Sequence, residues 1–165
     1  MPGATDGVVA IVDVQPIGDN KANGSLQIVQ TPTGIEISGR LMELAAGQHG
    51  FHVHENADCD DPGVHFAPDG NPHGDPKKGA HHLGDLGNIE AGAANEAIVY
   101  LEVDGPRLEG EQSLIDRVLV VHSGADDLKT QPSGNSGDPI ACGVIEAADA
   151  GGASEADPSK SPTTS

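Results

Sequence analysis

The chain has 165 residues, enough for one domain with its own hydrophobic core. Its formal net charge of −18 at pH 7 argues against nucleic acid and anionic membranes as partners, because both would repel an acidic surface. No stretch of the sequence approaches the length of a membrane span. The acidity has two interpretations: it keeps the protein soluble, or it adapts the protein to a salt-rich environment.

The composition favours a β protein. Hydrophobic residues make up 36% of the chain but aromatic residues only 2%, so the core is expected to consist of Val, Ile, Leu and Ala. The 23 glycines and 12 prolines imply many turns, which suit short strands better than helices.

Short apolar or alternating segments follow one another along the chain, each bounded by turn residues. The clearest alternation is in residues 97–103, where Ile98 and Tyr100 fall on one face. Strands are predicted at residues 8–14, 25–30, 35–41, 50–55, 97–103, 118–122 and 140–146, with a short extra strand at 113–115. Seven or eight short strands without an amphipathic helix predict an all-β sandwich or barrel.

Three segments fall outside this pattern. Residues 56–88 are dense in Gly, Pro, Asp and His, and residues 123–139 are shorter and also polar. A long loop in a small domain is expected to be functional or clamped in place. The composition from residue 147 onward is typical of disorder, so we expect one domain at 1–146 and a flexible acidic tail at 147–165.

The two cysteines, Cys59 and Cys142, leave three alternatives open: a disulfide, two thiolate ligands or two inert thiols. No CxxC motif pairs either residue. A bridge between them would close a long loop and contribute roughly 4–5 kcal/mol by loop-entropy arithmetic. It would also fit an oxidising compartment.

Two of the predicted strands carry histidines. His52 and His54 flank Val53, and alternate strand residues share a face, so both imidazoles point the same way. Such a pair makes half of a copper or zinc site, although two structural histidines would give the same pattern. His122 ends an apolar run, where a core histidine is the usual interpretation. Together with the other candidates it is interpreted as a ligand.

The long loop adds His65, His73, His82 and Asp85. These residues lie in a segment able to wrap around an ion, and three imidazoles with one carboxylate make a tetrahedral zinc site. The alternative, a set of solvated loop histidines, is less compatible with this concentration of the chain's eight histidines. The sequence therefore predicts a metalloprotein.

Six motifs occur in order along the chain: GFHVHE at 50–55, HFAP at 65–68, HLGDLGN at 82–88, VVH at 120–122, DD at 126–127 and ACGVI at 141–145. Together they resemble the copper–zinc superoxide dismutase family, and the resemblance runs from residue 8 to about residue 146. It implies a flattened Greek-key β-barrel of about eight antiparallel strands, with two long loops over a metal site. The implied reaction is dismutation of superoxide to oxygen and hydrogen peroxide.

The resemblance also implies a role for each candidate residue. The copper ligands, which would be the catalytic residues, are His52, His54, His65 and His122. The zinc ligands are His65, His73, His82 and Asp85, so that His65 bridges the two metals. Asp126 would orient ligands of both metals by hydrogen bonding. Cys59 and Cys142 would form a disulfide, His49 would be structural, and His81 would be solvated.

One position departs from the family pattern. The family carries an arginine three residues before the second cysteine, at the rim of the copper channel, where this chain has Pro139 preceded by Asp138. Proline offers neither charge nor N–H. Lys129 is a candidate substitute for guiding the anion, with Lys77 and Lys78 as further candidates. The departure keeps an alternative open, namely a non-catalytic copper- and zinc-binding relative that handles or stores metal.

Location and assembly are predicted only in outline. Residues 1–7 lack the basic and apolar regions of a signal peptide. The expected disulfide favours a periplasmic or extracellular protein, with a cytoplasmic location as the alternative. The resemblance is compatible with a homodimer.

Overall fold

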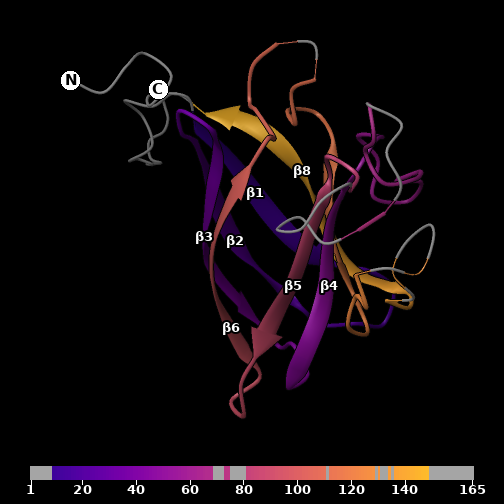
Figure 1. The fold of residues 1–165 in the computed structure, drawn as a ribbon. Coiled ribbons are helices and arrows are strands. Elements are labelled where there is room, and N and C mark those ends of the chain that lie inside the picture. The colour runs from indigo at the N-terminus through magenta and orange to yellow at the C-terminus, as the bar shows by residue number, and fades with distance from the viewer. Residues whose placement is uncertain are drawn as a thin grey trace.

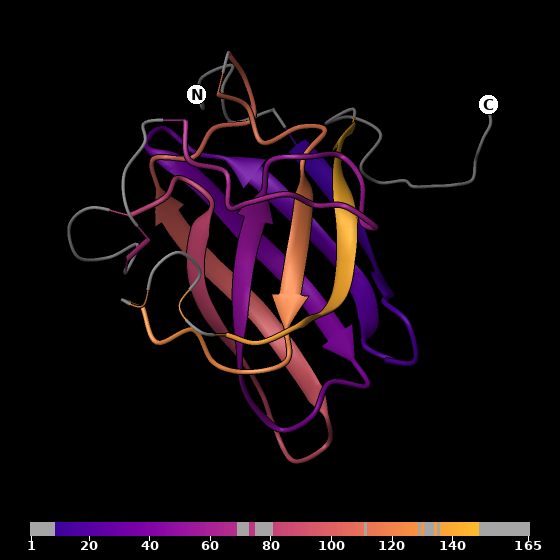
Figure 2. The ribbon, with the colours of Figure 1, turned by 90° about the vertical axis from the view of Figure 1, so that its right-hand side faces the viewer.

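The computed structural model describes residues 9–68, 73–74, 81–110, 112–128, 130, 134 and 136–148. These residues form eight antiparallel strands that wrap into a nearly closed barrel (Figure 1, Figure 2). No helix in this part of the chain is long and apolar enough to cross a membrane. The predicted all-β barrel is therefore confirmed.

Seven of the eight strands were predicted, and their ends differ from the expected ones by at most three residues. The strands are β1 (Val9–Pro16), β2 (Asn23–Gln30), β3 (Gly34–Met42), β4 (Gly47–His54), β5 (Asp85–Ala91), β6 (Glu96–Asp104), β7 (Val118–His122) and β8 (Pro139–Ala148). β8 extends through Ala148, and residues 149–165 lie outside the described part.

The order of strands across the sheet is β5-β4-β7-β8-β1-β2-β3-β6. Consecutive strands β3 and β4 are not neighbours, nor are β6 and β7, so the chain crosses between the two halves of the sheet as a Greek key does. β5 and β6 contact each other without a hydrogen-bonded ladder in the described residues. This seam is where the barrel is not closed.

Alternation along the strands produces the core. In β1, Ala10, Val12 and Val14 are buried, whereas Ile11 and Asp13 face solvent. The barrel interior is filled mainly by Val, Ile, Leu and Ala side chains, as the composition predicts, and both phenylalanines join them. In β1 the core therefore occupies one face of the strand, and the other face is exposed.

Two strand predictions were wrong. Residues 85–88 were assigned to the long loop, but they begin β5, which pairs with β4 around an irregularity between Gly50 and His52. Asp, Gly and Asn are poor strand formers, and pairing with β4 overrides this local preference. Residues 113–115 form no strand, because Ser113 makes only an isolated bridge with Arg107.

Candidate metal centre

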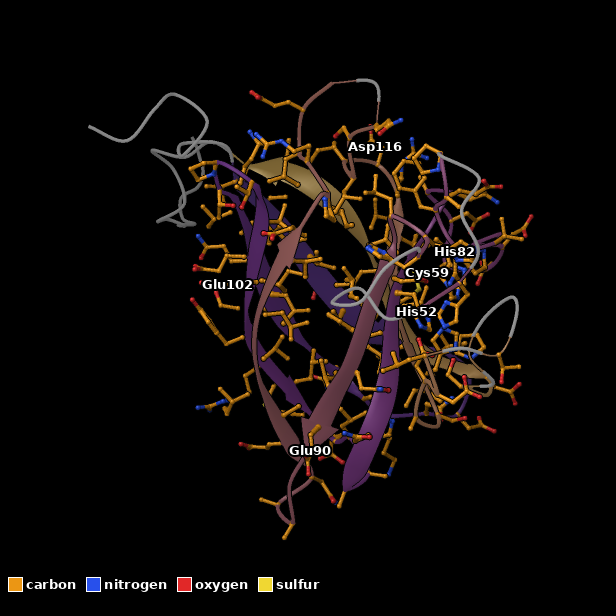
Figure 3. The ribbon with its side chains drawn as sticks, in the orientation of Figure 1. His52, Cys59, His82, Glu90, Glu102 and Asp116 are labelled. Atoms are coloured by element: carbon orange, nitrogen blue, oxygen red, sulfur yellow. A yellow bond between two sulfur atoms is a disulfide. The ribbon has the colours of Figure 1, made fainter. Side chains whose placement is uncertain are left out.

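The outer faces of two neighbouring strands carry three of the candidate ligands. In β4, Phe51 and Val53 enter the core, so His52 and His54 point out of the barrel. His122 ends β7, the neighbour of β4 in the sheet. Figure 3 shows His52 on the outside of the barrel beside β4. The labelled Cys59 and His82, from the first loop (residues 55–84, between β4 and β5), lie near it. Strand pairing thus places these histidines together.

Three backbone hydrogen bonds tie the first loop to β4. Val53 N donates to Gly84 O, Phe66 N donates to Val53 O, and Gly84 N donates to Phe66 O, each at 2.8 Å. A side chain at Gly84 would clash with the Val53 carbonyl, so only glycine allows this approach. Each of the three residues is adjacent in sequence to a candidate ligand. These three hydrogen bonds therefore fix the backbone next to candidate ligands in β4, in the first loop and at the start of β5.

The first cluster consists of four buried histidines whose ligand atoms all lie within 4.8 Å of one another: His52, His54, His65 and His122. One ring nitrogen of each has no hydrogen-bond partner among the described residues, Nδ1 in His52 and Nε2 in the other three. A buried polar atom left unpaired costs about 1–3 kcal/mol. One metal ion would satisfy all four nitrogens, and an all-imidazole set suits copper.

The opposite ring nitrogens fix how these rings are presented. His54 Nδ1 donates to Gly63 O at 2.8 Å, and His122 Nδ1 donates to Gly137 O at 3.0 Å. Because a carbonyl oxygen only accepts, the hydrogen is on Nδ1 and the Nε2 lone pair is directed away from the carbonyl. Both rings are therefore held in the tautomer that a metal requires at Nε2.

Burial keeps His52, His54 and His122 of the first cluster neutral. It lowers the pKa of His52 to about 3, although the hydrogen bond with Asp126 acts in the opposite direction. It likewise lowers the pKa of His54 to about 4 against its bond to Gly63, and it lowers the pKa of His122. Neutral imidazole is the form that binds metal.

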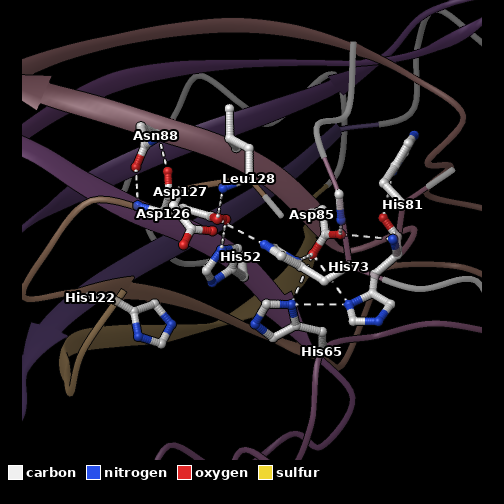
Figure 4. Close-up of polar contacts among 12 residues, drawn as sticks. His52, His65, His73, His81, Asp85, Asn88, His122, Asp126, Asp127 and Leu128 are labelled. Carbon is white, nitrogen blue, oxygen red and sulfur yellow. Dashed lines mark hydrogen bonds and ion pairs between the residues drawn. The ribbon is translucent and has the colours of Figure 1, made fainter. Parts of the chain in front are cut away.

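The second cluster gathers His65, His73 and His82 around Asp85. Figure 4 shows His65 and His73 beside Asp85. The Nδ1 atoms of His65 and His73 both lie 2.8 Å from Asp85 Oδ1, and that of His82 lies 3.3 Å away. The Nδ1 atoms of His65 and His82 are 3.2 Å apart. Ligand atoms around a tetrahedral zinc ion lie about 3.3 Å from one another, by the usual Zn–N and Zn–O lengths. The spacing and chemistry of this set fit zinc.

His65 contributes to both clusters through its two ring nitrogens. Nε2 is one of the four unpaired nitrogens of the first cluster, whereas Nδ1 faces Asp85 in the second. His65 lies in the first loop, and its backbone forms an isolated β-bridge with His54 of β4. A single side chain thus joins the two candidate sites.

Asp126 joins the clusters from the other side. Its Oδ2 accepts a hydrogen bond from His52 Nε2 at 2.6 Å, and its Oδ1 accepts one from His73 Nε2 at 2.8 Å. Asn88 of β5 holds the Asp126 backbone in turn, since Asp126 N donates to Asn88 Oδ1 and Asn88 Nδ2 donates to Asp126 O. The sequence predicted Asp126 but not Asn88, because only the pairing of β5 reveals its position.

The two carboxylates control the charge of the second cluster. Burial would lower the pKa of His73, but hydrogen bonds with Asp126 and Asp85 outweigh it and raise the pKa to about 9. Burial would raise the pKa of Asp85 and Asp126, but hydrogen bonds from His65 and His73, and from His52 and His73, hold both pKa values well below their usual range. Two buried anions suit a dication.

Further contacts fasten the first loop. Cys59 and Cys142 form a disulfide that ties this loop to β8, with their Cα atoms 6.0 Å apart. The guanidinium of Arg117 lies 3.6 Å from the centroid of the Phe66 ring, and its NH1 donates to Glu55 O. Sequence reasoning missed Arg117, because nothing local to β7 indicates which ring it covers.

Four further residues from the sequence analysis lie outside the two clusters. Pro139 and Asp138 are exposed, and Pro139 pairs with His122 where β7 meets β8. His49 is buried, with its ring nitrogens 2.8 Å from His122 O and 2.7 Å from Ala45 O. His81 is half-buried rather than solvated. Its Nδ1 donates to the carbonyl oxygen of His82 at 2.7 Å. Lys129, Lys77 and Lys78 lie outside the described residues.

Comparison with known proteins agrees with this arrangement. The family model described as copper/zinc superoxide dismutase (SODC) matches residues 22–145. Superoxide dismutase (Cu-Zn) 2 of Mesembryanthemum crystallinum is 39% identical over 139 residues, covering 78% of this chain and 89% of that protein. Superoxide dismutase (Cu-Zn) 3 of Arabidopsis thaliana is 37% identical, covering 78% and 85%. The extracellular superoxide dismutase (Cu-Zn) of Brugia pahangi is 39% identical, covering 74% and 68%. The chain therefore belongs to the copper/zinc superoxide dismutase family.

Proposed function

We propose that this protein dismutates superoxide to oxygen and hydrogen peroxide at a copper ion, with a zinc ion beside it. The observation that carries the proposal is the convergence of four buried, unpaired imidazole nitrogens next to a second, carboxylate-containing cluster. Copper would be held by His52, His54, His65 and His122. Zinc would be held by His65, His73, His82 and Asp85.

Each part of the centre has a distinct task in this proposal. Bound copper would accept one electron from a first superoxide and return it to a second, whereas zinc carries out no redox chemistry. Peroxide formation also needs protons, and the lone pair of the buried His65 Nε2 can hold one whenever it is not bound to copper. Asp126 keeps His52 and His73 oriented through both half-reactions.

The decisive experiment is the rate of superoxide decay, followed by pulse radiolysis from low to high salt with protein loaded with copper and zinc. We expect a copper-dependent rate near diffusion control. Zinc-only protein is the matched control, because it retains the second cluster but lacks the redox metal. A decay rate equal to that of buffer, with both metals bound, would reject the enzymatic proposal.

The alternative is a relative that binds copper and zinc without turnover. It is favoured by the rim of the first cluster, where exposed Pro139 and Asp138 offer no positive charge to an anion. Lys129 is proposed as the guiding cation in the active enzyme. A Lys129→Gln variant tests this role, because the rate should fall while both metals remain bound.

We further propose that the protein works outside the cytoplasm and that it self-associates as a dimer. The disulfide supports the location, as do the extracellular superoxide dismutases among the relatives. A flexible acidic tail is proposed for residues 149–165, on their composition, since residues 147 and 148 belong to β8. Sedimentation of the metal-loaded protein tests the dimer, and a single monomer peak at all concentrations would reject it.

A further inference from the structure

The Asp126 carboxylate is enclosed by donors on most sides. Besides the two imidazoles, Leu128 N donates to its Oδ1 at 2.7 Å. Asp126 as a whole is only 3% exposed although it belongs to a loop. An ionised carboxylate this well buried depends on keeping all its hydrogen bonds. The residue that covers the remaining side of the Asp126 carboxylate therefore affects both clusters, because Asp126 is bonded to a histidine of each.

Gly134 covers that side with its backbone. A Cβ atom built on Gly134 would lie far inside van der Waals contact with Asp126 Oδ1, and 2.6 Å from His73 Nε2. The residue is buried, and its φ of 76° also favours glycine. The backbone at Gly134, in the second loop (residues 123–138, between β7 and β8), thus lies directly on the hydrogen bond between Asp126 and His73.

Hydrogen bonds hold Gly134 in this place. Its N donates to Thr130 O at 2.6 Å, and its O accepts from Asp127 N at 2.9 Å. Thr130 N donates in turn to Asp127 Oδ1 at 2.8 Å. Asp127 follows Asp126 directly in the sequence. The backbone that carries the Asp126 carboxylate is therefore hydrogen-bonded to Gly134, the residue that covers this carboxylate.

We propose that Gly134 is a positioning residue of the metal centre, acting through Asp126. Without a side chain, its backbone seals the Asp126–His73 hydrogen bond from water and thereby fixes the orientation of His52 and His73 together. The inference rests on the proposed metal centre. It adds that the second loop contributes to zinc retention through a residue that touches neither metal.

The test compares Gly134→Ala with Gly110→Ala. Gly110 has a similar φ of 89°, but nothing lies within 4 Å of a Cβ built there, so the control carries the backbone strain without the contact. Zinc affinity, measured by competition with a chelator, should fall by about 10–100-fold in Gly134→Ala, as it does when partners of ligands are lost. In Gly110→Ala it should change less than about twofold. Equal effects in both variants would overturn the proposal.

A spectroscopic signature separates positioning from general destabilisation. In zinc-loaded, copper-free protein, the Nε2–H protons of His52 and His73 are hydrogen-bonded to Asp126 and should give slowly exchanging proton resonances. In Gly134→Ala the His73 resonance should broaden through exchange with water, whereas backbone amides of β1 stay protected. Unchanged exchange of the imidazole proton would contradict the role assigned to Gly134.

If Gly134→Ala folds poorly, slow exchange of the His73 Nε2–H proton in wild-type protein still tests the proposal, and rapid exchange would overturn it. A double-mutant cycle adds a test in variants that fold. When Asp126→Asn is already present, adding Gly134→Ala should weaken zinc binding by less than about twofold, because both changes act on one interaction. Additive losses would overturn the proposal. Wild-type protein that binds both metals but does not accelerate superoxide decay would reject the enzymatic function alone. Wild-type protein that binds no zinc would reject the metal centre and this inference with it.

Discussion

At the scale of single residues, His65 has the most demanding position. Its Nδ1 lies 2.8 Å from Asp85 in one cluster, while its Nε2 is unpaired in the other. We predict that His65→Ala lowers the affinities for copper and zinc together, each by more than the 10–100-fold typical of an outer partner. Chelator competition for each metal measures this. His81→Ala, which removes a nearby imidazole outside both clusters, is the control. If His65→Ala keeps the wild-type affinity for either metal, His65 is not a ligand shared by both metals.

Pro139 leads to a prediction about rate rather than binding. An arginine at this exposed position next to His122 would restore a cation at the rim. We expect Pro139→Arg to raise the rate constant for superoxide by about 10–100-fold at low salt and to steepen its decline with salt. Pro139→Gln supplies a long polar side chain without charge and should have little effect. If both variants react equally fast, guidance comes from elsewhere.

The buried histidines make the metal-free protein sensitive to acid. In the unfolded chain their pKa is near 6.5, but burial lowers it to about 3 in His52 and about 4 in His54. The folded state therefore binds fewer protons, and stability present above pH 6.5 is lost as the pH falls toward 4 and then 3. The expected slope is about 1.4 kcal/mol per pH unit for each histidine.

Urea unfolding of the chelator-treated protein between pH 4 and 7 measures this slope. The metal-loaded protein is the control, since ligation blocks protonation and should move the loss of stability to lower pH. A free energy of unfolding that stays constant from pH 6.5 to pH 4 would contradict the assignment of neutral histidines.

At the scale of elements, the sequence predicted strands well where side chains alternate and poorly where pairing decides. Residues 97–103 alternate clearly, and β6 follows with one added residue at each end. β5 begins with Asp85, Leu86, Gly87 and Asn88, which carry little strand preference, and it forms because β4 offers a partner. This one missed strand also concealed Asn88 and its two hydrogen bonds to Asp126.

Motif spacing brought out the candidate ligands because each metal-binding motif occupies a short segment. The contacts that hold these segments together were not predictable. The backbone bonds among Val53, Phe66 and Gly84 join positions up to 31 residues apart, and no local pattern encodes such pairing. The same holds for the contact of Gly134 with Asp126.

The disulfide acts between a loop and a strand. It joins residues 83 positions apart and so limits the unfolded chain strongly. We predict that replacing both Cys59 and Cys142 by Ser lowers the free energy of unfolding by about 4–5 kcal/mol. Urea unfolding of the metal-free protein measures the loss, and reduced wild-type protein should behave like the double variant. A loss below about 1 kcal/mol would mean that the unfolded state is already restricted by other means.

At the scale of the whole molecule, the charge is largely uncompensated. Every ion pair among the described residues joins a histidine to an aspartate, and none joins Lys or Arg to a carboxylate. Glu36 and Glu102 even lie directly opposite each other on β3 and β6. With a net charge of −18, repulsion between carboxylates opposes the folded state.

We therefore predict that salt stabilises the protein. The free energy of unfolding should rise by about 1–3 kcal/mol as sodium chloride increases from about 0.1 M to about 1 M, because screening shortens the reach of the repulsion. Thermal unfolding across this range measures the change. Glu36→Gln removes one of the facing charges and should reduce the dependence on salt. Stability that is independent of salt in wild-type protein would argue that the acidity serves solubility alone.

The proposed sharing of the His65 imidazole between two metals has a thermodynamic consequence. Two ions that bind through one side chain have linked equilibria, so each changes the affinity of the other by the same factor. If zinc orients the ring for copper, copper must favour zinc retention to the same degree. The linkage can be measured from either direction, and the two values must agree. In a cell, the retention of either metal would then depend on whether the other site is occupied.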